Sequence, residues 1–226
     1  SPRYRVTVGG RPVEVRDERY SFDVGLFDLA RPAQVEVEML SDFTTATLQP
    51  ERHGLRLERE GRKLRFTLGS PLKLVLQVDS LQPLALLATP PEKIIPDRCV
   101  TDVLAFPAGF PADGTLTPRT DRASYLAPGA LVKGRIEAKN VSNVSILGRG
   151  ILDTSGWSTR EDKTHGVLFE HSRDIVMEGV GVRAYHTWWQ TLFLNARDIR
   201  LSHLNLFGLG VNTDGVDIDG VRDFLV

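Results

Sequence analysis

The chain has little of what several classes of protein require. It carries one cysteine, Cys99, among 226 residues, so no internal disulfide can form. Its 28 basic residues do not outnumber its 29 acidic ones, so the chain lacks the excess of positive charge that is typical of nucleic-acid-binding proteins. No apolar run is long enough to cross a bilayer. We therefore expect neither a nucleic acid nor a membrane as a partner.

Helical periodicity is also scarce, whereas turn-forming residues are frequent. The chain has 20 glycines and 13 prolines, and its hydrophobic content of 41% is enough to bury a core. Frequent turns between short apolar runs are typical of strands rather than helices. The composition therefore predicts an all-β protein.

Residues 1–90 alternate between apolar and polar side chains. Residues 35–39 read Val-Glu-Val-Glu-Met and residues 64–68 read Leu-Arg-Phe-Thr-Leu. A period of two is the signature of an antiparallel sheet that is covered on one face. Several such strands predict an antiparallel β-sandwich, and the consecutive prolines of residues 89–93 indicate a linker. We expect two domains, 1–90 and 91–226.

A repeat runs through the second half. Asn or Asp followed by an apolar, a variable and an apolar residue begins at Asn143, Asp174, Asp198 and Asp223, at offsets of 31, 24 and 25 residues. One short strand per repeat is what a solenoid needs. A leucine-rich repeat would require a leucine-dense consensus, so a right-handed parallel β-helix fits better. Asn and Asp suit the bend between its sheets, where left-handed backbone is common.

Residues 212–217 read Asn-Thr-Asp-Gly-Val-Asp, which sets two carboxylates three positions apart beside apolar residues. Carboxylates in such a setting are costly unless they bind, bridge or catalyse. This segment is the first candidate for a functional site.

Three stretches together resemble a known family. Residues 125–130 read Tyr-Leu-Ala-Pro-Gly-Ala, residues 146–153 read Ile-Leu-Gly-Arg-Gly-Ile-Leu-Asp, and residues 212–217 match an N-T-D-G-x-D motif. They resemble the polygalacturonase-like (pectinase-type) glycoside hydrolases, which are right-handed parallel β-helix enzymes, over residues 95 to 226. The sandwich ahead of the helix resembles the related dextranase and isopullulanase family.

The resemblance implies an inverting glycoside hydrolase that cleaves an α-linked polysaccharide or oligosaccharide. Asp214 takes the place of the family's water-activating base. The family's general acid belongs to an Asp-Asp pair one coil later, past Val226, so the helix is expected to be truncated here and residues 1–226 alone to be inactive. The resemblance implies no cofactor or metal, and a secreted or periplasmic location.

Further site residues follow from the same resemblance. Trp189 and Gln190 fall where the family carries an aromatic segment beside its cleft, and Asn212 is placed to orient sugar or water. Aromatic faces stack on sugar rings while polar neighbours fix hydroxyl groups. Residues 165–169 begin with His-Gly where the family has Arg-Pro.

Structural roles remain open beside these assignments. Asp214 can be a turn aspartate, Asn212 can belong to an asparagine ladder, and Asp217 and Asp219 are predicted to cap the turn. Three functions therefore compete: a polygalacturonase-like hydrolase, a dextranase-like hydrolase of neutral α-glucan, and a non-catalytic β-helix that binds glycan or serves as an adhesin scaffold. A basic pair facing the cleft favours an acidic sugar, and the sandwich is expected to cap the helix.

Overall fold

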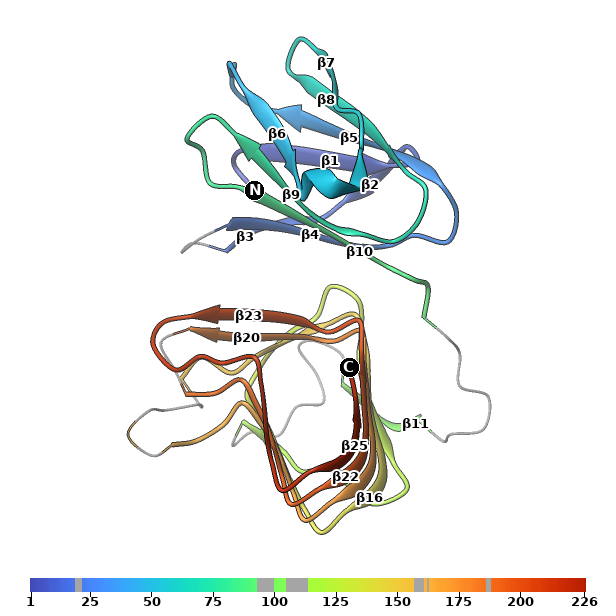
Figure 1. The fold of residues 1–226 in the computed structure, drawn as a ribbon, viewed down its shortest axis with the longest axis vertical. Coiled ribbons are helices and arrows are strands. Elements are labelled where there is room, and N and C mark those ends of the chain that lie inside the picture. Colours follow the sequence, from blue (N-terminus) through green and yellow to red (C-terminus); the bar gives the residue numbers. More distant parts are fainter. Residues whose placement is uncertain (19–21, 93–99, 105–113, 157–160, 162, 186–187) are drawn as a thin grey trace. The chain divides into compact units, whose positions relative to one another are not determined.

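The computed structural model describes residues 1–18, 22–92, 100–104, 114–156, 161, 163–185 and 188–226, and Cys99 lies outside these ranges. The prediction of an all-β chain is confirmed, because the described residues form strands throughout apart from one 3-10 turn, η1 (Glu51–His53). No helix among them has the length and apolar character that crossing a membrane requires. The chain divides into two compact units, Ser1–Lys93 and Ile94–Val226 (Figure 1).

The first unit is a sandwich of two five-stranded sheets. In spatial order, one sheet contains β2 (Arg11–Val13), β1 (Tyr4–Val8), β5 (Ala33–Met39), β8 (Lys63–Leu68) and β7 (Glu58–Glu60). The other contains β3 (Val15–Glu18), β4 (Phe22–Asp28), β10 (Leu84–Thr89), β9 (Lys73–Val78) and β6 (Ala46–Gln49). Alternate residues of both sheets, among them Val37, Phe66, Leu76 and Leu86, meet in one core.

One strand pair corrects the prediction of a wholly antiparallel sandwich. β4 and β10 run parallel, with Val24 opposite Ala85 and Phe27 opposite Ala88. Both strands contribute buried residues, and burial on both faces is typical of strands in a parallel pairing.

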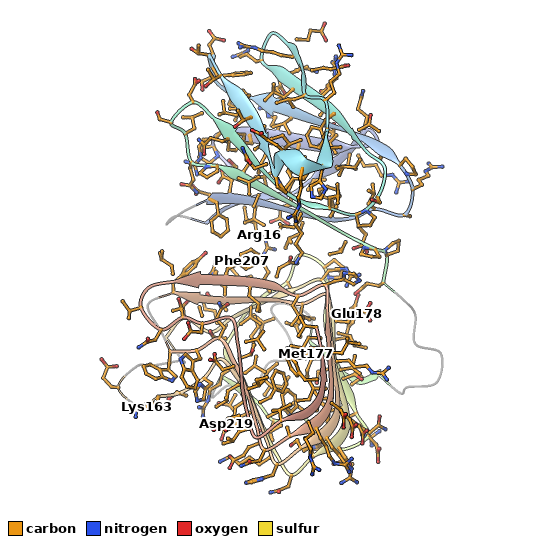
Figure 2. The ribbon with its side chains drawn as sticks, in the orientation of Figure 1. Arg16, Lys163, Met177, Glu178, Phe207 and Asp219 are labelled. Carbon is orange, nitrogen blue, oxygen red and sulfur yellow. The ribbon has the colours of Figure 1, made fainter. Side chains whose placement is uncertain are left out.

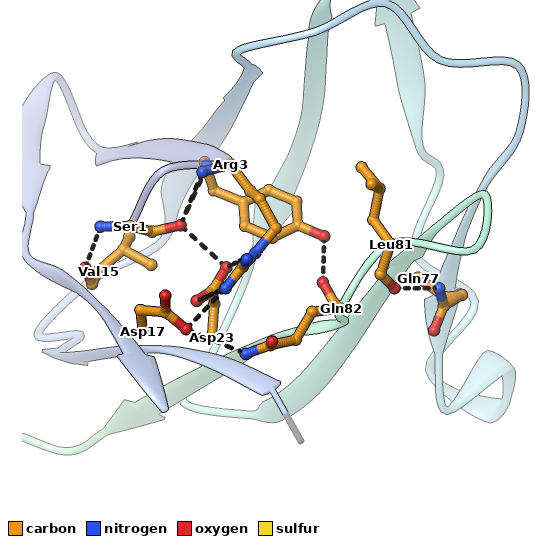
Figure 3. Close-up of polar contacts among 9 residues, drawn as sticks. Ser1, Arg3, Val15, Asp17, Asp23, Gln77, Leu81 and Gln82 are labelled. Carbon is orange, nitrogen blue, oxygen red and sulfur yellow. Dashed lines mark hydrogen bonds and ion pairs between the residues drawn. The ribbon is translucent and has the colours of Figure 1, made fainter. Parts of the chain in front are cut away.

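A polar network ties the amino terminus to the second sheet of the sandwich (Figure 3). The carboxylate of Asp23 is fully buried and accepts hydrogen bonds from Arg3 Nε (2.8 Å), Arg3 Nη2 (3.0 Å) and Ser1 Oγ (2.9 Å). Next to it, the buried Tyr4 hydroxyl donates to the Gln82 carbonyl at 2.5 Å. A buried charge is tolerable only when it is paired and hydrogen-bonded in this way.

This environment predicts an alkaline loss of stability. Burial, reinforced by the charge of Asp23, raises the pKa of Tyr4 from 10.0 to about 12. The folded state therefore keeps a proton that the unfolded state releases, so the contribution of Tyr4 is complete below pH 10 and is lost as pH rises through about 12. Urea denaturation across this range is expected to show the decline in wild type and a shallower one in Tyr4→Phe. Identical pH dependence in the two proteins would contradict the assignment.

The second unit is a parallel β-helix with three sheets, in which each strand from β12 on pairs with the strand three places along the chain, while β11 pairs with β13. The first sheet contains β12 (Thr115–Leu116), β15 (Arg135–Lys139), β18 (Val167–Glu170), β21 (Thr191–Leu194) and β24 (Val216–Asp219). The second contains β11 (Val100–Leu104), β13 (Ala123–Leu126), β16 (Ser142–Gly148), β19 (Arg173–Glu178), β22 (Arg197–Ser202) and β25 (Arg222–Leu225). The third contains β14 (Leu131–Lys133), β17 (Ile151–Asp153), β20 (Gly181–Tyr185) and β23 (Asn205–Leu209).

The predicted repeat marks the bend before the second sheet. Asn143, Asp174, Asp198 and Asp223 all have positive φ, between 54° and 57°. Each is the second residue of its strand, and pairing skips it between β16 and β19. The apolar residues that follow stack inside the coils, where Met177 also lies (Figure 2). In each repeat, the Asn or Asp therefore marks the bend, and the apolar residues that follow it belong to the core.

Candidate functional site

The candidate site lies at the start of the first sheet of the helix, where three coils are held together by their backbones. Gly166 N donates to Trp189 O (3.3 Å), Val167 N to Gln190 O (2.9 Å), and Gln190 N to Asp214 O (2.8 Å). These bonds continue the parallel register of β18, β21 and β24 into the turns before them. The turn that carries Asp214 is therefore fixed by the coil beneath it.

The same register places His165, Trp189 and Asp214 in one column. Each lies two residues before the first residue of its strand, and the first residues of β18, β21 and β24 are paired. Neighbouring strands of a sheet lie about 4.8 Å apart, so side chains in successive coils are neighbours. Along the helix, the backbone position of Asp214 thus follows those of two aromatic residues.

The rings form an aromatic stack of His165, Trp189 and Trp188. The His165 and Trp189 centroids are 5.4 Å apart at an interplanar angle of 27°, and those of Trp188 and Trp189 are 5.5 Å apart at 26°. His165 Nδ1 is buried without a hydrogen-bond partner, and burial lowers the pKa of this imidazole. A neutral imidazole beside two half-buried indoles gives an uncharged, flat surface.

Asp214 is exposed, and its carboxylate makes no hydrogen bond or ion pair with the described part of the chain. Its turn is held from both sides. Thr213 Oγ1 donates to Gly210 O (3.1 Å), and Thr191 Oγ1 donates to Gly215 O (2.9 Å). Asn212 is half-buried with a φ of 60°, which asparagine tolerates better than most residues. A fixed backbone carrying a free carboxylate suits a residue that acts on something outside the chain.

Asp217 is the second carboxyl group of the site, and the prediction that it caps the turn is wrong. It is the second residue of β24, paired with Leu192 of β21, and receives no hydrogen bond from the described residues. Its Oδ2 is buried. Burial raises its pKa, and the nearby charge of Asp214 raises it further. Asp219, near the end of the same strand, is exposed (Figure 2).

Gln190 lies behind the turn rather than on the surface. It is 3% exposed, and its Nε2 donates to the carbonyl of Thr213 at 3.2 Å. Gly208 leaves room for it, since a Cβ there would come within 2.9 Å of Gln190 Nε2. The side chain therefore supports the segment that presents Asp214.

His165 is a site residue that sequence reasoning passed over, although the spacing points to it. The offsets from His165 to Trp189 and from Trp189 to Asp214 are 24 and 25 residues, as they are between Asp174, Asp198 and Asp223. The column therefore follows the repeat already seen in the second sheet. Sequence spacing could not have identified Asp217 in this way. The burial of one of its oxygens depends on how the coils pack, which the sequence pattern does not show.

Cations on the earlier coils of this sheet are paired. Lys139 Nζ lies 2.9 Å from Glu170 Oε2, and Arg135 Nη2 lies 3.0 Å from Glu137 Oε2. Lys163, on the loop before β18, is exposed (Figure 2). Within the described ranges, no three His, Cys, Asp or Glu side chains are grouped so that they could hold a metal ion.

Comparison with known proteins shows the fold. No protein-family model matches the chain. No curated protein matches it. Among solved structures, Dex49A from Penicillium minioluteum matches with a TM-score of 0.58 at 13% identity, over 100% of this chain and 70% of its own. A "putative glycosyl hydrolase" from Parabacteroides merdae matches with a TM-score of 0.41 at 14% identity, over 49% of this chain and 62% of its own.

Proposed function

We propose that this protein is a glycoside hydrolase that cleaves an α-linked glycan by an inverting mechanism, with Asp214 as the base. The observation that carries the proposal is the position of Asp214, an exposed carboxylate that no described residue pairs or hydrogen-bonds, on a fixed turn whose backbone is in register with Trp189 of the aromatic stack. We take the coils as right-handed, as parallel crossover connections almost always are. A non-catalytic scaffold has no need of an unpaired carboxylate beside a second carboxyl group.

Asp214 supplies the base that the proposed chemistry needs, and the general acid is expected on a later coil. Inverting hydrolysis needs a carboxylate to activate water on one face of the sugar and a carboxylic acid to protonate the leaving oxygen on the other. Asp214 is placed to take the proton of such a water, since nothing in the described chain competes for its oxygens. Trp189 and His165 offer flat faces for a sugar ring one and two coils away. Asn212 is proposed to orient sugar or water, and Gln190 to hold the turn.

A neutral α-glucan is the substrate class we favour. The carboxylates of Asp214 and Asp219 would repel an acidic sugar, and the cations described on the sheet are paired with glutamates. The shared fold with Dex49A, a dextranase, supports the same choice. A polygalacturonase-like activity on uronides is the second candidate, favoured by the exposed Lys163, which lies two residues before His165 in the sequence.

The two units take different parts in the proposal. We assign catalysis to residues 91–226 and a capping role to residues 1–90, because the apolar end of a solenoid needs cover. We also propose a secreted or periplasmic location, where polymeric glycans are met.

A product screen on dextran, pullulan and pectin, made with the complete protein because residues 1–226 alone are expected to be inactive, tests the function, and Trp189 tests the site. Trp189→Ala is expected to lower kcat/KM on the cleaved glycan about tenfold, or about 1.4 kcal/mol, because a sugar ring loses its stacking face. Trp189→Phe is the matched control, since it keeps an aromatic face and is expected to retain most of the activity. Glycan binding without any product would favour the scaffold, and equal kcat/KM in wild type and Trp189→Ala would remove Trp189 from the site.

A further inference from the structure

Asp217 is an unusual residue in the outer layer of the helix. Its side chain lies over Leu192 of the preceding coil, which in turn pairs with Leu168 of the coil before. Leu192 is 8% exposed, so partly buried Asp217 lies next to an apolar side chain. Its Oδ2 is buried and receives no hydrogen bond from the described residues.

Among the residues that the structure describes, the groups on β21, β24 and the turn before β24 that face Asp217 carry no positive charge. β21, the strand packed beside it, presents Leu192 and Leu194 in the paired outward positions. β24 itself contributes Asp219, and the turn before β24 contributes Asp214. A carboxylate with one oxygen buried and without a donor is less favourable than an exposed one, and a like charge nearby adds to the cost. Protonation removes both penalties.

We propose that Asp217 carries a proton and acts as a positioning residue, so that Asp214 alone bears the negative charge that attracts and deprotonates water. This inference rests on the proposed function. In the reaction the water proton passes to Asp214 as the water oxygen bonds to the sugar carbon and the glycosidic bond breaks. The leaving oxygen takes its proton from a separate carboxylic acid, the general acid of the complete site, and the proton on Asp217 stays where it is. The raised pKa of Asp217, caused first by burial and then by Asp214, agrees with this arrangement.

The proton can be located without any measurement of activity. Carboxyl carbon shifts in NMR, followed against pH in the full chain, are expected to show Asp217 titrating above the usual aspartate range. Asp214→Asn removes the neighbouring charge and is expected to move that titration downward. Asp219→Asn is the matched control, as it changes a carboxylate on the same face of the same strand, and is expected to move it less. Titration of Asp217 in the ordinary range, or equal effects of the two variants, would overturn the proposal.

Kinetics then test the positioning role. Asp217→Asn mimics the protonated form, so turnover at acidic pH is expected to stay within about tenfold of wild type. The decline in kcat that wild type shows as pH rises through the pKa of Asp217 is expected to disappear. Loss of turnover as complete as in Asp214→Asn, or a pH profile equal to that of wild type, would overturn the role. Unchanged turnover in Asp214→Asn would instead retire the proposed function, while the NMR titration still decides where the proton lies.

Discussion

Asp214→Asn is expected to lower kcat on the cleaved glycan by about 10²–10⁴-fold, the usual contribution of a positioned general base. Asparagine keeps the size of the side chain and removes the oxygen basicity that accepts the water proton. The turn is held by main-chain and Thr213 contacts rather than by this carboxylate, so the fold is expected to persist. Affinity for the glycan, measured by calorimetry, is expected to change little, because the aromatic stack remains.

Asp219→Asn is the control for this variant as well. It removes one negative charge from the same strand, from an exposed position at its far end. Its kcat is expected to stay close to that of wild type. Turnover by Asp214→Asn at the wild-type rate would end the assignment of Asp214 as the base.

Phe193→Ala is expected to lower the free energy of unfolding of the helical unit by about 3–5 kcal/mol, the usual cost of removing a buried phenyl ring. Phe193 is fully buried, stacks on Phe169 at 5.8 Å between centroids, and lies 6.1 Å from Phe224 in the next coil. Each coil of a solenoid is stabilised chiefly by its neighbours, so one cavity weakens two interfaces.

Urea denaturation followed by far-ultraviolet circular dichroism measures the effect. Leu225→Ala is the control, because Leu225 is 64% exposed and its truncation leaves no cavity. A loss below about 1 kcal/mol for Phe193→Ala would show that the coil relaxes around the missing ring.

The repeat could be read from the sequence because one physical constraint recurs in each coil. A residue with positive φ must stand at the bend, and Asn143, Asp174, Asp198 and Asp223 meet that need. The parallel direction of β10 relative to β4 could not be predicted from the sequence. Alternation predicts which side chains of a strand face the core, but it does not predict which strand pairs with it or in which direction. Parallel pairing there depends on contacts between residues far apart in the chain.

The candidate site was predictable in part, for a similar reason. The motif identified Asp214, and the structure leaves that carboxylate exposed. Gln190 and Trp189 are adjacent in sequence, yet one is buried behind the turn and the other stacks on His165. At a bend the alternation of strand faces does not hold, so the sequence alone cannot say which neighbour turns outward.

The backbone ladder beneath Asp214 has a consequence for how such a protein can be altered. Each coil is aligned by main-chain hydrogen bonds to the next, so the loop leading into β18 or β21 can change in length or composition without displacing the strand it precedes. If the proposed function holds, grafting the segment that carries His165 is expected to change sugar preference while Asp214, which is held by Gln190, stays in place. On the proposed function, residues that recognise the sugar could therefore change independently of the residue that takes part in bond cleavage.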